Sequence, residues 1–170
     1  MKRRHFLTST SAAILSAGVL SQTAVRRAFA QGQTPQKRLA MPPLLDTRAT
    51  GRLALAATPG RTAFNGGAST ATAGYNQPYL GPTVVMQNGD LAAEVRNNLD
   101  EAITTHWHGL LVPGEYDGGP QQAIEPGATW SPKMTIAQDP ATIWYHSHMH
   151  GRIPQQVYFG LAGAIHLTDG

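Results

Sequence analysis

The chain has 170 residues, of which 41% are hydrophobic and 14% charged, a composition typical of a globular protein and not of a disordered one. It contains 18 glycines and 12 prolines, and this abundance of turn formers favours a loop-rich β protein over a helical one. There is no cysteine, which excludes a disulfide framework and thiolate metal sites.

The first 30 residues have the features of an export signal. A basic start with Arg3 and Arg4 is followed by a mildly apolar segment, 12–25, and then by small residues up to Ala30, where a signal peptidase would cut. The RR-x-F-L core resembles a twin-arginine signal, which implies the twin-arginine translocase as a partner and a periplasmic location. A membrane anchor is the alternative, but the apolar run is shorter than the ~20 residues that a span needs.

The charge balance changes once this leader is set aside. Five of the 13 basic residues lie in the first 30 positions, whereas all 10 acidic residues follow them, so the net charge changes from +3 to −2. The positive charge of the whole chain therefore gives no support for nucleic-acid binding. No membrane association beyond export is expected.

The rest of the chain is predicted to be an extended lead-in, 31–50, followed by one all-β domain, 51–170. Strands are predicted where apolar residues alternate or cluster between turn residues, namely at 52–64, 83–87, 91–99, 104–111, 129–137, 142–148 and 161–168. Flexible or turn-rich segments are predicted at 65–74 and 113–127, and 151–160 is predicted to be irregular. Seven short strands without a helical period indicate a Greek-key β-sandwich or barrel.

Four of the seven histidines form two His-x-His pairs. Residues i and i+2 of a strand point to the same face about 6.6 Å apart, so His106 and His108 would point together, and so would His146 and His148. If the two strand ends lie side by side, four imidazoles converge. Neutral imidazole binds copper, zinc, iron and nickel, so the pattern predicts a metal site.

The other conspicuous residues have simpler interpretations. His150 is followed by a glycine at the expected end of a strand, and we expect it to be a surface group or a support for the ligands. His166 lies in an apolar strand and is expected to be structural. Trp107, Trp144 and Tyr145 are expected to belong to the core or to the wall of the histidine cluster.

The order of these motifs is similar to that of one family. HWHG (106–109) is followed by DGGPQ (117–121), a Pro-Gly turn, WYHSH (144–148) and GLAG (160–163). With YNQPYLGPTVVMQNGD before them, these motifs resemble the N-terminal cupredoxin domain of the multicopper oxidases over Met41 to Asp169. VPGEYDGGPQ and the HxHxHG ending look most like the periplasmic copper-efflux (cuprous) oxidases, which are laccase-like and also use twin-arginine export.

The resemblance implies copper as the cofactor and gives each motif residue a role. His106 would bind the type 2 copper, His108 and His146 would share one type 3 copper, and His148 would bind the other type 3 copper. Asp117, in the loop after HWHG, would help to supply protons to reduced oxygen. The alternative for Asp117 is a plain turn residue, because Asp-Gly is common in turns.

The family's full enzyme has three such domains, and this chain matches the first of them. The resemblance implies that four more histidines, and a type 1 copper site that needs a cysteine, come from the last domain. Partners are therefore expected to be the second and third cupredoxin domains, in cis or as a split chain, together with O2. The activity implied is oxidation of Cu(I) or a phenol coupled to reduction of O2 to water, and the chain alone is expected to be truncated and inactive.

Three other interpretations remain open. The chain could be a standalone periplasmic protein that stores or delivers copper. It could be a structural or interaction protein, since some relatives have lost their copper ligands, although all four expected histidines are retained here. Finally, three histidines and a water would also suit Zn(II).

Overall fold

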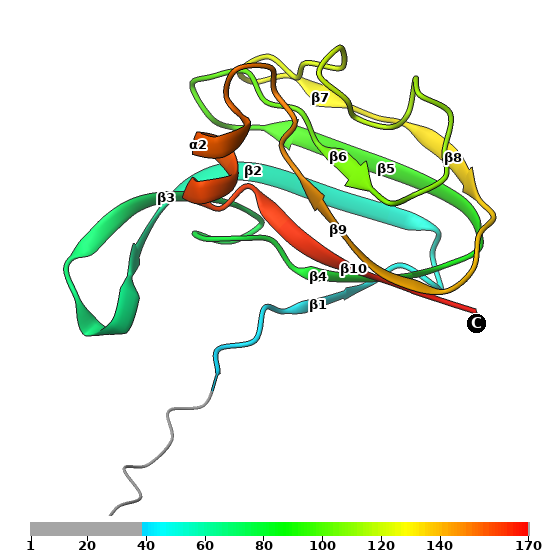
Figure 1. Ribbon diagram of the computed structural model, residues 1–170, viewed down its shortest axis with the longest axis horizontal. Helices are drawn as coiled ribbons and strands as arrows, with labels where there is room; N and C mark the ends of the chain where they lie inside the picture. The colour runs from blue at the N-terminus through cyan, green and yellow to red at the C-terminus, as the bar shows by residue number, and fades with distance from the viewer. Residues whose placement is uncertain (1–38, 170) are drawn as a thin grey trace, which may run out of the picture. The chain divides into compact units, whose positions relative to one another are not determined.

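Two β-sheets of five strands each face one another across an apolar core (Figure 1). The computed structural model describes residues 39–169. The export signal predicted at 1–30, with its cleavage near Ala30, lies outside the described residues. The elements in chain order are β1 Leu44–Asp46, β2 Arg52–Ala63, the 3-10 turn η1 Phe64–Gly66, β3 Ser69–Tyr75, β4 Thr83–Gln87, β5 Gly89–Asn97, β6 His106–His108, β7 Thr129–Trp130, β8 Lys133–Ile136, β9 Ala141–His146, α2 Ile153–Phe159 and β10 Ala162–Thr168.

The first sheet has the order β1-β4-β10-β9-β6, with β4 parallel to both of its neighbours and β9 antiparallel to both of its own. The second sheet has the order β3-β2-β5-β7, and β8 also pairs with β5. Strands adjacent in sequence, such as β4 and β5, lie in different sheets, so the chain crosses between the layers. This arrangement confirms the predicted β-sandwich.

Alternation along the strands explains how the two layers are held together. In the first half of β2 and along β5 from Leu91 every second side chain is buried, for example Leu53 and Leu55 in β2 and Val95 in β5. Val84 and Ile165 of the opposite sheet are fully buried against them. Apolar contact between the two inner faces is the main source of stability in such a sandwich.

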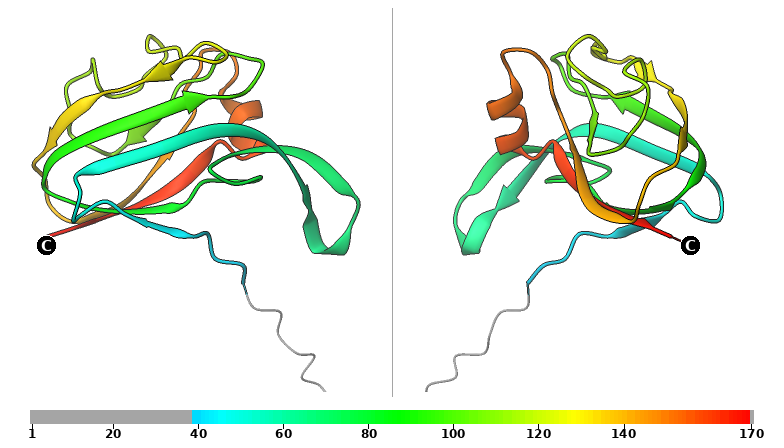
Figure 2. Two further views of the ribbon diagram at one scale, coloured as in Figure 1. Left: turned by 180° about the vertical axis from the view of Figure 1, so that it is seen from behind. Right: turned by 45° about the vertical axis from the view of Figure 1, so that its right-hand side comes forward.

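The loop predicted for 65–74 is wrong. Only η1 and a short connection interrupt the chain before β3, which pairs antiparallel with the second half of β2 from Ala63–Ser69 to Ala57–Tyr75. The outer half of β3 is exposed, because this hairpin extends beyond the two sheets as an arm (Figures 1 and 2). The outer half of β3 is held in the strand by backbone pairing with β2 and buries no apolar face. Its sequence therefore lacks the alternation of apolar residues that predicts a strand.

The irregular segment predicted at 151–160 is also wrong, because it contains α2. Pro154 lies in the first turn of this helix, where its missing N–H has no intrahelical role, and Gly160 ends it in the left-handed conformation. Gln156 is the only buried residue of the helix. Two turns with a single buried position show no amphipathic period.

Strand ends differ from the predicted ranges in ways that matter for the histidines. The strand predicted at 142–148 ends at His146, so His148 lies in the following turn. The strand predicted at 104–111 is reduced to β6, and that predicted at 129–137 is divided into β7 and β8 by Ser131 and Pro132. β1 lies inside the segment expected as lead-in and pairs with β4.

No helix within residues 39–169 has the length and apolar character to cross a membrane.

Candidate metal centre

The pairing of β6 with β9 brings the two His-x-His segments together. His106 lies directly opposite His146 in this antiparallel pair, and their ring centroids are 5.4 Å apart. His108 lies opposite Trp144, and its ring is 5.5 Å from that of His146. Residues directly opposite one another share a face of the sheet, so these three imidazoles occupy one side of the β6–β9 pair.

His148 joins the group from the turn after β9. Its ring centroid is 5.3 Å from that of His106 and 5.8 Å from that of His146. Strand alternation therefore does not place it, contrary to the geometry expected from the sequence. Instead, its backbone N–H donates to Thr104 Oγ1 at 2.7 Å, which holds the turn against the segment before β6.

Three of the histidines offer nitrogens close enough to share one ion. The ligand atoms of His106, His108 and His146 all lie within 4.8 Å of one another. His108 Nδ1 and His146 Nε2 are 3.3 Å apart. Two nitrogens bound tetrahedrally at 2.0–2.1 Å would be separated by roughly 3.3 Å, so this pair already has the spacing of a metal's ligands.

Backbone carbonyls fix the tautomers of two rings. His106 Nδ1 donates to the carbonyl of Asp117 at 2.8 Å, and His146 Nδ1 donates to the carbonyl of Ser147 at 2.8 Å. A carbonyl only accepts, so each Nδ1 carries the hydrogen and each Nε2 keeps its lone pair. A hydrogen bond from the second ring nitrogen is the usual support of a metal-bound histidine.

The surroundings of His146 favour the neutral, ligating form. Burial lowers the pKa of His146 below its usual value, and the three neighbouring imidazoles lower it further, while the bond to Ser147 opposes the shift. Metal binding requires an imidazole without its second proton. Burial of His146 therefore favours the neutral form that a metal ion binds.

His148 supplies a separate indication. Its Nδ1 is buried and has no hydrogen-bond partner; within residues 39–169 only one other buried side-chain polar atom, Gln122 Oε1, shares this condition. Buried polar atoms are nearly always paired, and an unmade bond costs about 1–3 kcal/mol. A cluster of imidazoles with an unpaired buried nitrogen fits a bound metal ion.

Asp117 is held beside His106 by the loop that follows β6. The N–H of Trp107 donates to the Asp117 carbonyl at 3.2 Å, and the Trp107 indole donates to the Tyr116 carbonyl at 3.1 Å. The Asp117 carboxylate lies 3.3 Å from His106 Nδ1 and is partly exposed. Asp117 is therefore both a turn residue and a neighbour of the cluster, so the two interpretations of the sequence are compatible.

Gly118 makes this close approach possible. Its φ is +72°, and an added Cβ would lie 1.8 Å from the carbonyl oxygen of Thr105. Only glycine fits that contact and that conformation without strain. Gly118 thus allows the loop that carries Asp117 to pack against the backbone of Thr105 and His106.

The aromatic residues divide between the two faces of the β6–β9 pair. Trp107 and Tyr145 are fully buried in the core. Trp144 lies on the opposite face, stacked on the His146 ring with centroids 4.0 Å apart and 38% of its surface exposed. It forms a wall of the cluster.

The last two histidines of the chain stay apart from the cluster. His150 is exposed in the turn that precedes α2, as expected for a surface group. His166 is exposed on β10, where its Nδ1 lies 3.4 Å from Thr142 Oγ1. Neither belongs to the group whose nitrogens converge.

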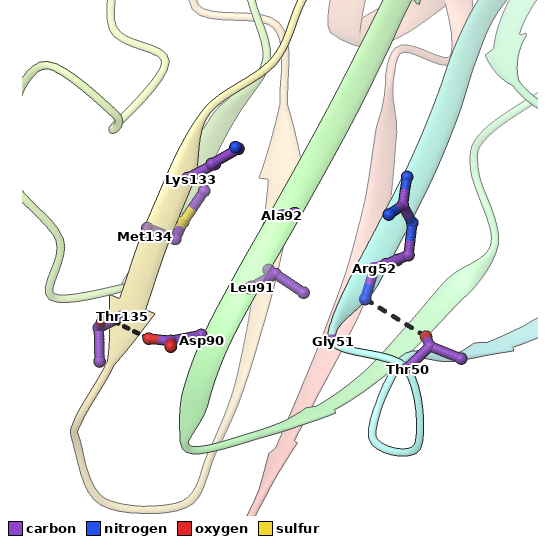
Figure 3. Close-up of a pocket in the computed structure, with 9 residues that line it drawn as sticks. All are labelled: Thr50, Gly51, Arg52, Asp90, Leu91, Ala92, Lys133, Met134 and Thr135. Atoms are coloured by element: carbon purple, nitrogen blue, oxygen red, sulfur yellow. Dashed lines mark hydrogen bonds between the residues drawn. The ribbon is translucent and has the colours of Figure 1, made fainter.

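A hollow of about 530 Å³ lies away from the histidines, across β2, β5 and β8 of the second sheet (Figure 3). Arg52 and Lys133 lie on either side of Ala92, with which both are paired across the sheet. The Asp90 carboxylate accepts a hydrogen bond from Thr135 at its rim. None of its lining residues carries an imidazole.

A buried polar cluster next to the histidines has no signature in the sequence. Ser147, Gln156 and Thr104 are buried and hydrogen-bonded to one another or to the neighbouring backbone. A serine between two histidines and a glutamine outside any apparent helix carried no pattern that would single them out.

The fold and the site together define a β-sandwich with a cluster of imidazoles that is suited to a metal ion. A family model described as multicopper oxidase matches residues 56–170. The chain belongs to the multicopper oxidase family, and its fold is the expected all-β, cupredoxin-like one.

Relatives of known name support this assignment and show its limits. The multicopper oxidase mco of Staphylococcus aureus is 44% identical over 116 residues, which cover 68% of this chain and 26% of that protein. The cell division protein FtsP of Edwardsiella tarda is 38% identical over 170 residues, which cover 99% of this chain and 34% of that protein. This chain therefore spans about a quarter to a third of the length of these relatives.

Solved structures give the same result. The laccase-like multicopper oxidase CueO from Ochrobactrum sp., described as active on lignin model compounds, superposes with a TM-score of 0.75 at 42% identity. The match covers 78% of this chain and 30% of that one. The multicopper oxidase McoA from Aquifex aeolicus superposes with a TM-score of 0.72 at 33% identity, over 78% and 30% of the two chains. The relatives are thus larger proteins than this chain.

Proposed function

We propose that this chain supplies the N-terminal half of a trinuclear copper site in an exported oxidase. In this proposal His106 holds the type 2 copper, His108 and His146 share one type 3 copper, and His148 holds the other type 3 copper. Copper bound there would take up electrons from a substrate and deliver them to O2, which is reduced to water. The remaining ligands would come from further domains, in cis or as a separate chain.

One observation carries the proposal: four imidazoles from two distant segments converge, and the ligand atoms of three of them, His106, His108 and His146, lie within 4.8 Å of one another. The 3.3 Å spacing of His108 Nδ1 and His146 Nε2 supports a shared ion for that pair. The fixed tautomers of His106 and His146 leave Nε2 without a hydrogen in both rings, with a lone pair that can bind a metal. An all-imidazole set without thiolate suits copper or zinc, and membership of the multicopper oxidase family favours copper.

Asp117 is proposed to hold and pass protons. Each O2 that becomes water consumes four protons, so a carboxylate beside the ligands has a clear task. The Asp117 carboxylate is 3.3 Å from His106 Nδ1 and is 32% exposed, so it touches both the cluster and solvent. A proton taken up from solvent at the carboxylate could therefore be given up on the side of the histidines.

Electron entry is proposed to lie outside this chain. A blue-copper site needs a cysteine ligand, and the chain has none. The oxidation of Cu(I) or of a phenol would then require the domains that complete the relatives' greater length. By itself the chain is expected to bind copper without oxidase turnover.

A periplasmic location completes the proposal. The RR-x-F-L core and the small residues before position 31 support export by the twin-arginine translocase. The match to FtsP of Edwardsiella tarda extends over 99% of the chain and so includes this leader. Fractionation of cells that express the chain would test it: mature protein in the periplasm is expected, and its loss when Arg3 and Arg4 are both changed to lysine.

Metal analysis tests the central claim. The purified chain is titrated with Cu(II) and with Zn(II), and the bound metal is measured after gel filtration. We expect copper to bind more tightly than zinc, and His146→Ala to weaken copper binding by at least 10-fold, because it removes a ligand of the convergent group. His166→Ala is the matched control, since His166 lies outside that group. Equal binding by both variants would refute the site, and a preference for zinc would refute the copper assignment.

A second candidate follows from the relatives named cell division protein FtsP, which match almost the whole chain. A role in cell division would not by itself require imidazoles. If a host that lacks the chain shows a division defect, a variant with both His106 and His146 changed to alanine separates the two functions. Full rescue by this variant would favour the division role, whereas failure of rescue would favour copper.

A further inference from the structure

We propose that Gln156 of α2 is a positioning residue that sets the spacing of the two histidine-bearing segments. The inference rests on the proposed metal centre and concerns a residue whose side chain hydrogen-bonds to Ser147 and Ala102 and not to the four histidines. Gln156 is 1% exposed and is the only buried residue of its helix. A buried amide must be hydrogen-bonded to offset the cost of burial, so the partners of Gln156 indicate its role.

The two ends of the Gln156 amide bind the two segments that carry the ligands. Its Oε1 accepts a short hydrogen bond from Ser147 Oγ, and Ser147 stands between His146 and His148. Its Nε2 donates to the carbonyl of Ala102 at 2.9 Å, four residues before His106. One side chain therefore links the approach to β6 with the turn after β9.

Ser147 transmits this link to the imidazoles. Its carbonyl accepts from His146 Nδ1 at 2.8 Å and thereby fixes the orientation of that ring. Its hydroxyl also accepts, at 3.4 Å each, from the N–H groups of Thr104 and Met149. A shift of Ser147 would therefore turn the His146 ring and move the turn that carries His148.

The helix itself is anchored so that Gln156 cannot easily move. The N–H of Leu161 donates to the Gln156 carbonyl at 2.9 Å, and Gly160 ends the helix with a φ of +118° where an added Cβ would lie 2.3 Å from the Ala73 carbonyl. The N–H of Ser147 donates in turn to the Leu161 carbonyl at 3.1 Å. Figure 1 shows α2 beside β3 and the start of β10.

Loss of such a hydrogen-bond network should change metal affinity, whereas loss of ordinary packing should change the stability of the fold. Partners that hold a metal-bound histidine in place usually alter metal affinity about 10–100-fold when they are removed. An apolar core residue would alter stability but would leave the geometry of the bound metal unchanged once the protein is folded. The two effects can be measured separately.

The test compares four variants of the full chain: Gln156→Leu, Ser147→Ala, the double variant and Gln155→Leu. Gln155 is exposed on the same helix and provides the matched control for the same substitution. Copper affinity is measured by competition with a chelator, the ligand geometry by the Cu(II) EPR spectrum, and folding by thermal unfolding without metal. We expect Gln156→Leu and Ser147→Ala to weaken copper binding about 10–100-fold and to change the hyperfine splitting, with Gln155→Leu like the wild type.

The double variant distinguishes positioning from stability. It removes both members of the Ser147–Gln156 bond, and either single variant already breaks that bond, so the loss in melting temperature should be smaller than the sum of the losses in the two single variants. Copper affinity should stay low, because the link between the segments is still absent. Copper affinity that rises and falls with the melting temperature across the variants, or an unchanged EPR spectrum in Gln156→Leu, would overturn the inference alone. Absence of copper binding by the wild type would overturn both this inference and the proposed function.

Discussion

Replacement of Gly118 by alanine tests whether the Asp117 loop positions His106, a proposed metal ligand. Two costs can be worked out from the structure. Alanine in the left-handed region at a φ of +72° costs about 1–2 kcal/mol. The added Cβ would also lie 1.8 Å from the Thr105 carbonyl oxygen, which is backbone and cannot turn aside, so the loop must move away from β6.

Movement of the loop adds a second cost. The buried Trp107 N–H would lose its acceptor, the Asp117 carbonyl, and an unpaired buried donor costs about 1–3 kcal/mol. The expected loss in the free energy of unfolding is therefore about 2–5 kcal/mol. His106 would lose the same carbonyl, so its tautomer and orientation would no longer be fixed, and copper affinity should fall by about 10-fold or more.

Gly127→Ala is the matched control. Gly127 has nearly the same conformation, with a φ of +76°, but an added Cβ there meets nothing within 4 Å. It should cost only the conformational part, about 1–2 kcal/mol, and should leave copper affinity unchanged. Urea unfolding followed by tryptophan fluorescence and a copper competition assay give both quantities. Equal destabilisation by the two variants, or full copper affinity in Gly118→Ala, would refute the reasoning.

Three further predictions concern single side chains. Tyr145→Phe should lower the free energy of unfolding by about 1 kcal/mol, since its hydroxyl donates to a buried backbone carbonyl at 2.8 Å; chemical denaturation measures this, and a neutral result would contradict it. Trp144→Phe should remove a large part of the fluorescence quenching that Cu(II) binding causes, because Trp144 is the indole stacked on His146; unchanged quenching would place the ion elsewhere. Arg48 lowers the pKa of Asp46 to about 2, so the small stabilisation from this exposed pair should be present above pH ~4 and lost as the pH falls toward 2, where the melting curves of Asp46→Asn and the wild type should meet.

Strand content and the histidine cluster could be predicted because both follow short-range rules. Alternating burial in β2 and β5 is visible in the sequence as apolar residues at every second position. The His106–His108 and His146–His148 spacings indicated a metal site before any pairing was known. What the sequence could not supply was the register, which places His106 opposite His146 across 40 residues of chain and depends on the packing of both sheets.

The convergence of His148 was predicted for the wrong reason. Strand alternation would have aligned it with His146, but β9 ends at His146 and the turn brings His148 inward instead. The contacts that shape this turn come from Thr104, Leu161 and Gln156, which lie before β6 and after β9. Bonds between residues so far apart in sequence leave no local pattern, which is also why the buried glutamine was not recognised.

The alternation on β6 and β9 separates the metal centre from the core of the fold. Trp107 and Tyr145 point into the sandwich and are fully buried, whereas His106, His146 and Trp144 occupy the other face of the same strands. Loss of the metal would therefore empty no part of the core. Small domains whose core is the metal site unfold without it, but this domain buries its apolar residues independently of the ligands. The chain can thus fold before any metal binds, with the rings of His106 and His146 held by hydrogen bonds to backbone carbonyls. The proposed half-site needs this property if another domain is to complete it.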